Sequence, residues 1–174
     1  VVLLMMWMDI SSFFSNVNDD AREQFFYFQK VDQTRANGIR ALHEGSRVTM
    51  VDSTGERLAG EQIFTGDHQG SPDSNCESTG CTYQLCQALQ HWQVGFELHD
   101  GRLVSPSMYC DDLKAAFGGV GVSIEQAVRQ AEFACHDIIV PWSRKYGQHW
   151  KCKTDKNNSK CGYTAIVVDE YGYR

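Results

Sequence analysis

Cysteines are the residues of this chain best able to do chemistry. There are seven, all beyond position 75: Cys76, Cys81, Cys86, Cys110, Cys135, Cys152 and Cys161. The first three do not form the paired Cys-x2-Cys ladder of a zinc site. So many cysteines predict disulfides in an oxidising compartment, with a metal site or free core thiols as the alternatives. One pair stands out, because Cys152 and Cys161 bracket the polar loop Lys153–Lys160 just before an apolar strand.

A Cys135-His136-Asp137 triplet could suggest a thiol nucleophile with its base. Neighbouring residues of a helix, however, project about 100° apart and do not face each other. Cys135 also falls on the expected buried face of its helix. We therefore interpret it as a core cysteine beside an exposed histidine, and we expect no catalytic residue here.

Metal and cofactor signals are weak. The six histidines show no His-x3-His or His-Glu-x-x-His spacing. Asp67-His68 and Asp73–Glu77 could offer oxygen ligands to calcium, but the twelve-residue EF-hand register is missing. No phosphate-binding loop or dinucleotide fingerprint occurs. We expect no metal, no cofactor and no enzymatic activity.

Size and charge narrow the function classes. A chain of 174 residues, 42% hydrophobic and 22% charged, fits one globular domain or one domain with an appendage. Its formal net charge of -6 disfavours passive binding to nucleic acid or to an anionic membrane surface. A nucleic-acid partner is therefore not expected, and such a role would need a local basic patch.

The N-terminal region predicts a long helix. Val1–Met8 is wholly apolar but shorter than the about 20 residues of a bilayer span, so it is either a buried strand or helix start, or the end of a longer hydrophobic helix. Asp9–Glu44 contains no proline, which permits one helix of up to about 40 residues. Apolar residues follow a seven-residue repeat at Phe14, Val17, Ala21, Phe28, Val31 and Leu42. Other apolar residues lie outside this repeat, so the helix would be apolar on more than one side. It would be either a central core helix or, as we favour, an assembly helix that also packs on neighbouring copies.

Beyond Gly45 the patterns predict strands and one further helix. Arg47–Asp52 alternates as a strand, Thr65–Gly80 reads as a surface loop, and Trp92–Val104 reads as a hairpin turning at Asp100-Gly101. A Ser123 capping box begins a helix that Pro141 should stop, and the run 163–168 is an apolar strand. The predicted fold class is α+β, with a long N-terminal helix packed against an antiparallel β-sheet head, an additional short helix and disulfides. The expected parts are an assembly helix at 1–45 and a β-rich head at 46–174.

Four segments resemble one known family. The run Gly38–Thr49 is similar to the helix end and Val-Thr strand start of the GspH/FimT family, which comprises type IV pilus minor pilins and type II secretion pseudopilins. Ile10–Phe13, Trp92–Gly101 and Cys161–Arg174 resemble further family segments in the same order. Ser11 stands where such pilins often have proline, and only half of the basic DNA-contacting tail is present, so DNA binding is not carried over.

The resemblance implies a structural subunit, a minor pilin or pseudopilin. Its partners would be other pilin or pseudopilin subunits in a homo- or hetero-filament, with the inner membrane as its location before assembly and an extracellular or periplasmic filament afterwards. The expected filament interface consists of Phe13, Phe14, Val17, Ala21, Phe25, Phe28 and Val31, and Arg174 is a candidate ligand contact. The alternatives are an extracellular ligand- or DNA-binding pilin module, or a disulfide-stabilised secreted enzyme or unrelated membrane-anchored domain.

Overall fold

The computed structural model describes residues 1–44, 47–49, 51–57, 61–62, 72–152, 160–169 and 172–173. In chain order the elements are β1 (Val2–Ser11), a 3-10 turn (Phe14–Asn16), α1 (Asp19–Phe28), α2 (Gln33–Glu44), β2 (Arg47–Val48), β3 (Glu61–Gln62), α3 (Pro72–His91), β4 (Phe96–Glu97), β5 (Leu103–Val104), β6 (Ser107–Tyr109), β7 (Asp112–Gly119), α4 (Ile124–Phe133), a π-helical segment (Ala134–Ile139), α5 (Val140–Lys145), β8 (His149–Trp150), β9 (Gly162–Asp169) and β10 (Gly172–Tyr173). The fold is α+β, as the strand and helix patterns predict.

The first element is a strand, so the predicted long N-terminal helix was wrong. β1 lies between β7 and β9 and runs antiparallel to both, which gives its backbone partners on each side. An apolar run of this length is what a central strand needs. After β1, two local features set the start of α1 and its separation from α2. The Asn18 side chain accepts from the Ala21 N–H and starts α1, and Lys30, at φ +52°, separates α1 from α2.

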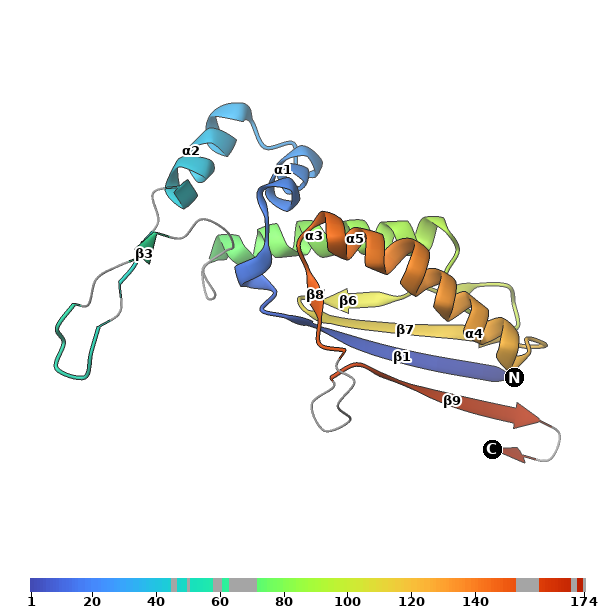
Figure 1. Ribbon diagram of the computed structural model, residues 1–174. Helices are drawn as coiled ribbons and strands as arrows, with labels where there is room; N and C mark the ends of the chain where they lie inside the picture. Colours follow the sequence, from blue (N-terminus) through green and yellow to red (C-terminus); the bar gives the residue numbers. More distant parts are fainter. Residues whose placement is uncertain are drawn as a thin grey trace.

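The main sheet follows the strand order β10-β9-β1-β7-β4-β5, with β6 also pairing with β7 and β8 with β1. β4 runs parallel to β7, and the other pairs in this sheet are antiparallel. α3, α4 and α5 cover one face (Figure 1), and within the described ranges no helix covers the other. Because β1 is a central strand, Val2–Ser11 shares this sheet with strands from the rest of the chain.

The core lies between the sheet and the three covering helices. Alternate side chains of β1 and β7 enter it, and α3 and the α4–α5 region supply the other half. Its largest fully buried members include Tyr146, Phe117, Ile10, Leu85, Leu89, Leu113 and Ile139. The Trp142 indole N–H donates to the Cys81 carbonyl at 3.2 Å, which ties α5 to α3 across this core.

Several local predictions are confirmed. β4 and β5 form the hairpin, with Gly101 at φ +80° in its turn. Ser123 and Gln126 make the capping box of α4, and β9 covers the predicted 163–168 strand. The predicted strand from Arg47 is present as the short β2.

Two other local predictions were wrong. Pro141 does not end the helical region. It lies in the first turn of α5, where a backbone N–H has no partner within the helix, so the proline costs no hydrogen bond. Residues 72–80, predicted as loop, form the first half of α3. Polar Ser74, Glu77 and Ser78 are buried there, which hydrophobic patterning does not anticipate. None of the described helices is long and apolar enough to cross a bilayer.

Candidate active site

Two aspartates occupy opposite positions at one end of the two central strands of the sheet. Asp9 of β1 is the register partner of Asp112 of β7, so both lie on the same face of adjacent antiparallel strands. The face is the one that the helices leave uncovered, since the even-numbered residues Leu4 and Ile10 of β1 enter the core. Like charges placed directly opposite destabilise a sheet. A fold that keeps such a pair therefore needs positive charge nearby.

A third carboxylate belongs to the turn between β6 and β7. This turn consists of Cys110 and Asp111, and Cys110 has φ +50°, a conformation that residues other than glycine rarely adopt. The backbone N–H of Ile10 donates to the Asp111 carbonyl at 2.9 Å, which fixes the turn beside the end of β1. The fold thus brings Asp9, Asp111 and Asp112 together from two distant segments of the sequence.

Two lysines supply the positive charge. The Lys151 ammonium forms an ion pair with Oδ1 of Asp9, and Nζ of Lys160 lies 3.4 Å from Oδ2 of the same carboxylate. The hydrogen bond to Asp9 raises the pKa of the Lys151 ammonium, and the negative charges of Asp9 and Asp111 act in the same direction. Lys151 is therefore charged at neutral pH and faces at least two of the three carboxylates.

Backbone contacts hold these lysines in place. The Lys151 N–H donates to the Asp9 carbonyl at 2.8 Å, and the Lys160 N–H donates to the Lys151 carbonyl at 3.2 Å. Each lysine is also next in sequence to a half-cystine, because the structure joins Cys152 to Cys161. This is the disulfide predicted from the sequence.

The uncovered face next to the carboxylates carries an aromatic ring and another cation. Trp7 of β1 is the register partner of both Lys114 and Gly162 on its two neighbouring strands. Its indole lies against Gly162, where an added Cβ would come within 2.6 Å of the ring. Trp7 remains 41% exposed and Met5 43%. Aromatic and positively charged groups therefore adjoin the acidic cluster.

Three aspartates offer hard oxygen donors, the kind that Mg²⁺ and Mn²⁺ prefer. Among the described residues, no group of three or more His, Cys, Asp or Glu side chains is arranged to hold a metal ion as it stands. The ammonium groups of Lys151 and Lys160 lie against Asp9, where a cation would bind that carboxylate. By donor chemistry the three carboxylates suit a divalent cation, although they are not arranged to hold one as they lie here.

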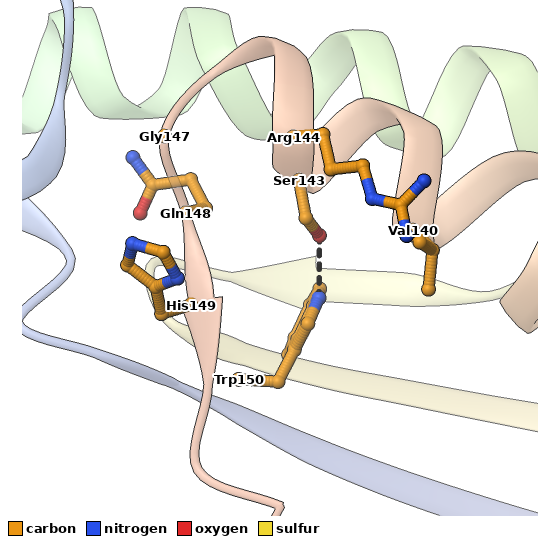
Figure 2. Close-up of a pocket in the computed structure, with 7 residues that line it drawn as sticks. All are labelled: Val140, Ser143, Arg144, Gly147, Gln148, His149 and Trp150. Carbon is orange, nitrogen blue, oxygen red and sulfur yellow. Dashed lines mark hydrogen bonds between the residues drawn. The ribbon is translucent and has the colours of Figure 1, made fainter.

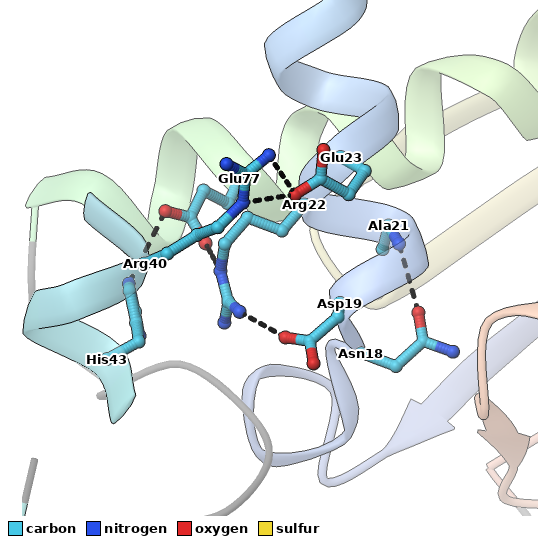
Figure 3. A network of polar contacts seen from close by, with 8 residues as sticks. All are labelled: Asn18, Asp19, Ala21, Arg22, Glu23, Arg40, His43 and Glu77. Carbon is cyan, nitrogen blue, oxygen red and sulfur yellow. Dashed lines mark hydrogen bonds and ion pairs between the residues drawn. The ribbon is translucent and has the colours of Figure 1, made fainter. Parts of the chain in front are cut away.

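A second polar cluster joins α1 and α2 to α3 (Figure 3). Nε of Arg22 donates to Oε2 of Glu77 at 2.8 Å, and its Nη1 contacts Asp19 at 2.6 Å. His43 Nε2 lies 3.5 Å from the other Glu77 oxygen. The side chains of Arg22 and Glu77 are 6% and 1% exposed. This buried ion pair connects α1 to α3, and His43 adds a contact from α2.

A cavity of about 500 Å³ lies between α5 and β8. Figure 2 shows that Ser143, Arg144 and Val140 line it from α5, and Gln148 and Trp150 from the strand side. The Trp150 indole N–H donates to the Ser143 hydroxyl at 2.5 Å. Its lining residues carry no carboxylate, in contrast to the cluster around Asp9.

The structure places the other sequence-predicted residues apart from the carboxylates. Of the expected filament interface, Phe13, Val17 and Ala21 are buried in the core, Phe14, Phe25 and Val31 are partly buried, and Phe28 is exposed. Cys135 lies with its Sγ 3.6 Å from Sδ of Met6, and burial raises the pKa of its thiol, which does not suit a nucleophile. Arg174 lies outside the described residues.

Sequence reasoning missed the aspartates and the two lysines. The signals were an aspartate directly after an apolar run, at Asp9, and a consecutive aspartate pair at Asp111 and Asp112 between two short strand-like segments. The assignment of Asp9 to a long helix hid the first signal, because only as a strand end does it meet Asp112.

Comparison with known proteins shows a likeness of fold. No protein-family model matches the sequence, and no curated protein is significantly similar to it. The fold is similar to that of apo telomerase from Candida tropicalis truncated from its C-terminal domain, with a TM-score of 0.64, 12% sequence identity and 97% of this chain covered. The matched part is 32% of the telomerase chain. At this identity the likeness concerns the fold.

Proposed function

We propose that this chain is the catalytic domain of a nucleic-acid polymerase, in which Asp9, Asp111 and Asp112 bind two divalent cations and direct nucleotidyl transfer. The observation that carries the proposal is Asp9 opposite Asp112 in adjacent strands, with Asp111 in the adjoining turn. Carboxylates on a rigid sheet are held more precisely than on loops. Their mutual repulsion, which costs stability in the cation-free protein, is what a pair of divalent cations would relieve.

The roles of the side chains follow from their positions. When bound, two such cations would activate an attacking hydroxyl and stabilise both oxygens of an in-line displacement at phosphorus. Asp9 and Asp112 would hold them from two strands, and Asp111 would complete the oxygen set from the turn. Lys151 and Lys160, once off Asp9, would remain close enough to neutralise charge on a triphosphate.

The uncovered face of the sheet would take the nucleic acid. Trp7 offers a ring on which a base can stack, and Lys114 beside it offers a partner for phosphate. Lys114, Lys151 and Lys160 would together supply the local positive charge that a chain of net charge -6 requires for such a role. The proposal therefore sets aside the expectations of no enzymatic activity and no nucleic-acid partner.

The fold likeness supports a polymerase over other enzymes that use two cations. Nucleases and phosphatases share the carboxylate chemistry, so the acids alone do not separate the classes. A likeness to a telomerase over nearly the whole of this chain favours strand synthesis. The filament hypothesis, in contrast, required residues 1–45 to form one long helix, and β1 occupies the start of that range.

Primer extension tests the proposal. The full chain would be incubated with a labelled DNA primer annealed to an RNA or a DNA template, all four deoxynucleoside triphosphates, and Mg²⁺ or Mn²⁺. We expect cation-dependent extension that Asp112→Asn reduces at least a hundredfold, while Asp137→Asn on the exposed side of the π-helical segment leaves it unchanged. Shortening of the primer, or extension that survives Asp112→Asn, would contradict polymerase chemistry at this site.

A further inference from the structure

The disulfide and the two site lysines form one covalent unit. Lys151 precedes Cys152, and Lys160 precedes Cys161, so the bridge fixes both lysine backbones relative to each other. The N–H to carbonyl bond from Lys160 to Lys151 closes the same unit, and the Lys151 N–H bond to the Asp9 carbonyl attaches it to β1. Sγ of Cys161 itself lies 4.0 Å from that Asp9 carbonyl.

We propose that the Cys152–Cys161 disulfide is a redox-responsive positioning element of the carboxylate site, which holds Lys151 and Lys160 on Asp9 in competition with divalent cations. This inference rests on the proposed function. In the oxidised chain the bridge keeps the ammonium groups of Lys151 and Lys160 close to the Asp9 carboxylate. Reduction removes the covalent link beside Lys160, which is the more exposed of the two, and lets it leave.

The size of the effect follows from competition. A cation binds only the fraction of molecules whose Asp9 is open, so its apparent dissociation constant equals the intrinsic constant divided by that fraction. If the lysines occupy Asp9 in nine molecules of ten, affinity falls about tenfold. The bridge limits how far the Lys160 backbone can move from Lys151, so it raises the local concentration of the second lysine at Asp9.

The redox step balances with an external dithiol. One thiolate of the reductant attacks a sulfur of the bridge to give a mixed disulfide, and the second thiolate then displaces it. The protein gains two electrons and two protons to form two thiols, while the dithiol becomes a cyclic disulfide. Cys152 is exposed and Cys161 partly so, which leaves the bridge accessible to such a reagent.

The test is a titration of the full chain with Mn²⁺, followed by the electron paramagnetic resonance signal of the free ion. Oxidised wild type would be compared with wild type reduced by dithiothreitol and with the double variant Cys152→Ser/Cys161→Ser. We expect reduction, and the serine variant, to lower the Mn²⁺ dissociation constant about three- to tenfold. Circular dichroism would confirm that each form is folded.

A variant without the two lysines tests the same inference in the oxidised protein, in case the reduced chain unfolds. Lys151→Gln/Lys160→Gln, kept oxidised, should bind Mn²⁺ more tightly than oxidised wild type and should not respond to dithiothreitol. Its control is Lys30→Gln/Arg129→Gln, which removes the same charge from exposed positions elsewhere in the chain and should retain the redox response.

The outcomes separate the two proposals. If Asp9→Asn abolishes Mn²⁺ binding but the lysine variant binds no more tightly than oxidised wild type, the redox inference is overturned and the carboxylate site stands. If Asp9→Asn leaves Mn²⁺ binding unchanged, the carboxylate site itself is wrong, and the inference falls with it.

Discussion

Asp9 and Asp112 occupy directly opposite positions on β1 and β7, on the face of the sheet that no described helix covers. Asp9 is nearly buried and bears an ion pair with Lys151, whereas Asp112 is exposed. The two acids therefore differ in what their removal would cost. The repulsion between the two carboxylates can therefore be measured from protein stability alone, by replacing the exposed Asp112.

Replacing Asp112 should stabilise the cation-free protein. Asp112→Asn removes one of two opposing charges and keeps the shape, so the free energy of unfolding at pH 7 should rise by about 0.2–1 kcal/mol. The measurement is urea denaturation in the presence of a chelator. Asp137→Asn should change the free energy of unfolding little. A clear loss of stability in Asp112→Asn would mean that the two carboxylates do not repel each other.

Breaking the buried ion pair should be costly. Glu77→Gln removes the buried carboxylate that pairs with the Arg22 guanidinium, while the exposed Asp19 stays in contact with it, and we expect a loss of about 3–5 kcal/mol in the free energy of unfolding. The exposed pair Arg102–Asp100 provides the control, since Arg102→Ala should cost less than about 1 kcal/mol. Equal effects of the two substitutions on chemical denaturation would show that α1 and α3 are not joined as described.

The position of Val17 separates the observed fold from a protruding helix. Val17 is 0% exposed and Phe28 41%. Val17→Asp buries a charge, which costs several kcal/mol, and should abolish cooperative unfolding. Phe28→Asp should leave a folded chain by circular dichroism. A protruding assembly helix would tolerate both substitutions in the isolated protein, so a stable Val17→Asp variant would argue for it.

Trp7 should contribute to nucleic-acid binding more than to stability. Loss of one stacked base costs about 1–3 kcal/mol, so Trp7→Ala should weaken binding of a single-stranded oligonucleotide about five- to a hundredfold. Fluorescence anisotropy with a labelled oligonucleotide measures this. Trp92 is 60% exposed and packs on Phe133 away from the carboxylates, so Trp92→Ala is the matched control. Equal losses in the two variants would indicate binding elsewhere.

Local patterns predicted much of the fold. The Ser123 capping box, the Asp100-Gly101 turn and the apolar strand at 163–168 each depend on neighbours in sequence, and each is present. The α+β class followed from them. The disulfide between Cys152 and Cys161 also followed from a short loop between the two cysteines.

The predictions that were wrong concerned segments whose structure depends on contacts with residues far away in the sequence. Val1–Met8 is equally suited to a buried strand or an apolar helix, and only its pairing with β7 and β9 decides between them. The first half of α3 looked like a loop because Glu77 and its polar neighbours are stabilised by Arg22, which lies 55 positions away. The carboxylate site was missed for the same reason, since Asp9 meets Asp112 only through the sheet register.

Divalent-cation binding tests the central claim most directly. Mn²⁺ titration of the full chain, reduced to open the site, would be compared for wild type, Asp9→Asn, Asp111→Asn and Asp112→Asn, with Asp137→Asn as the control. The account predicts saturable binding that each of the three site variants weakens at least tenfold and that the control leaves unchanged. Binding that is the same in all five proteins, or no binding by folded wild type, would contradict a catalytic carboxylate site.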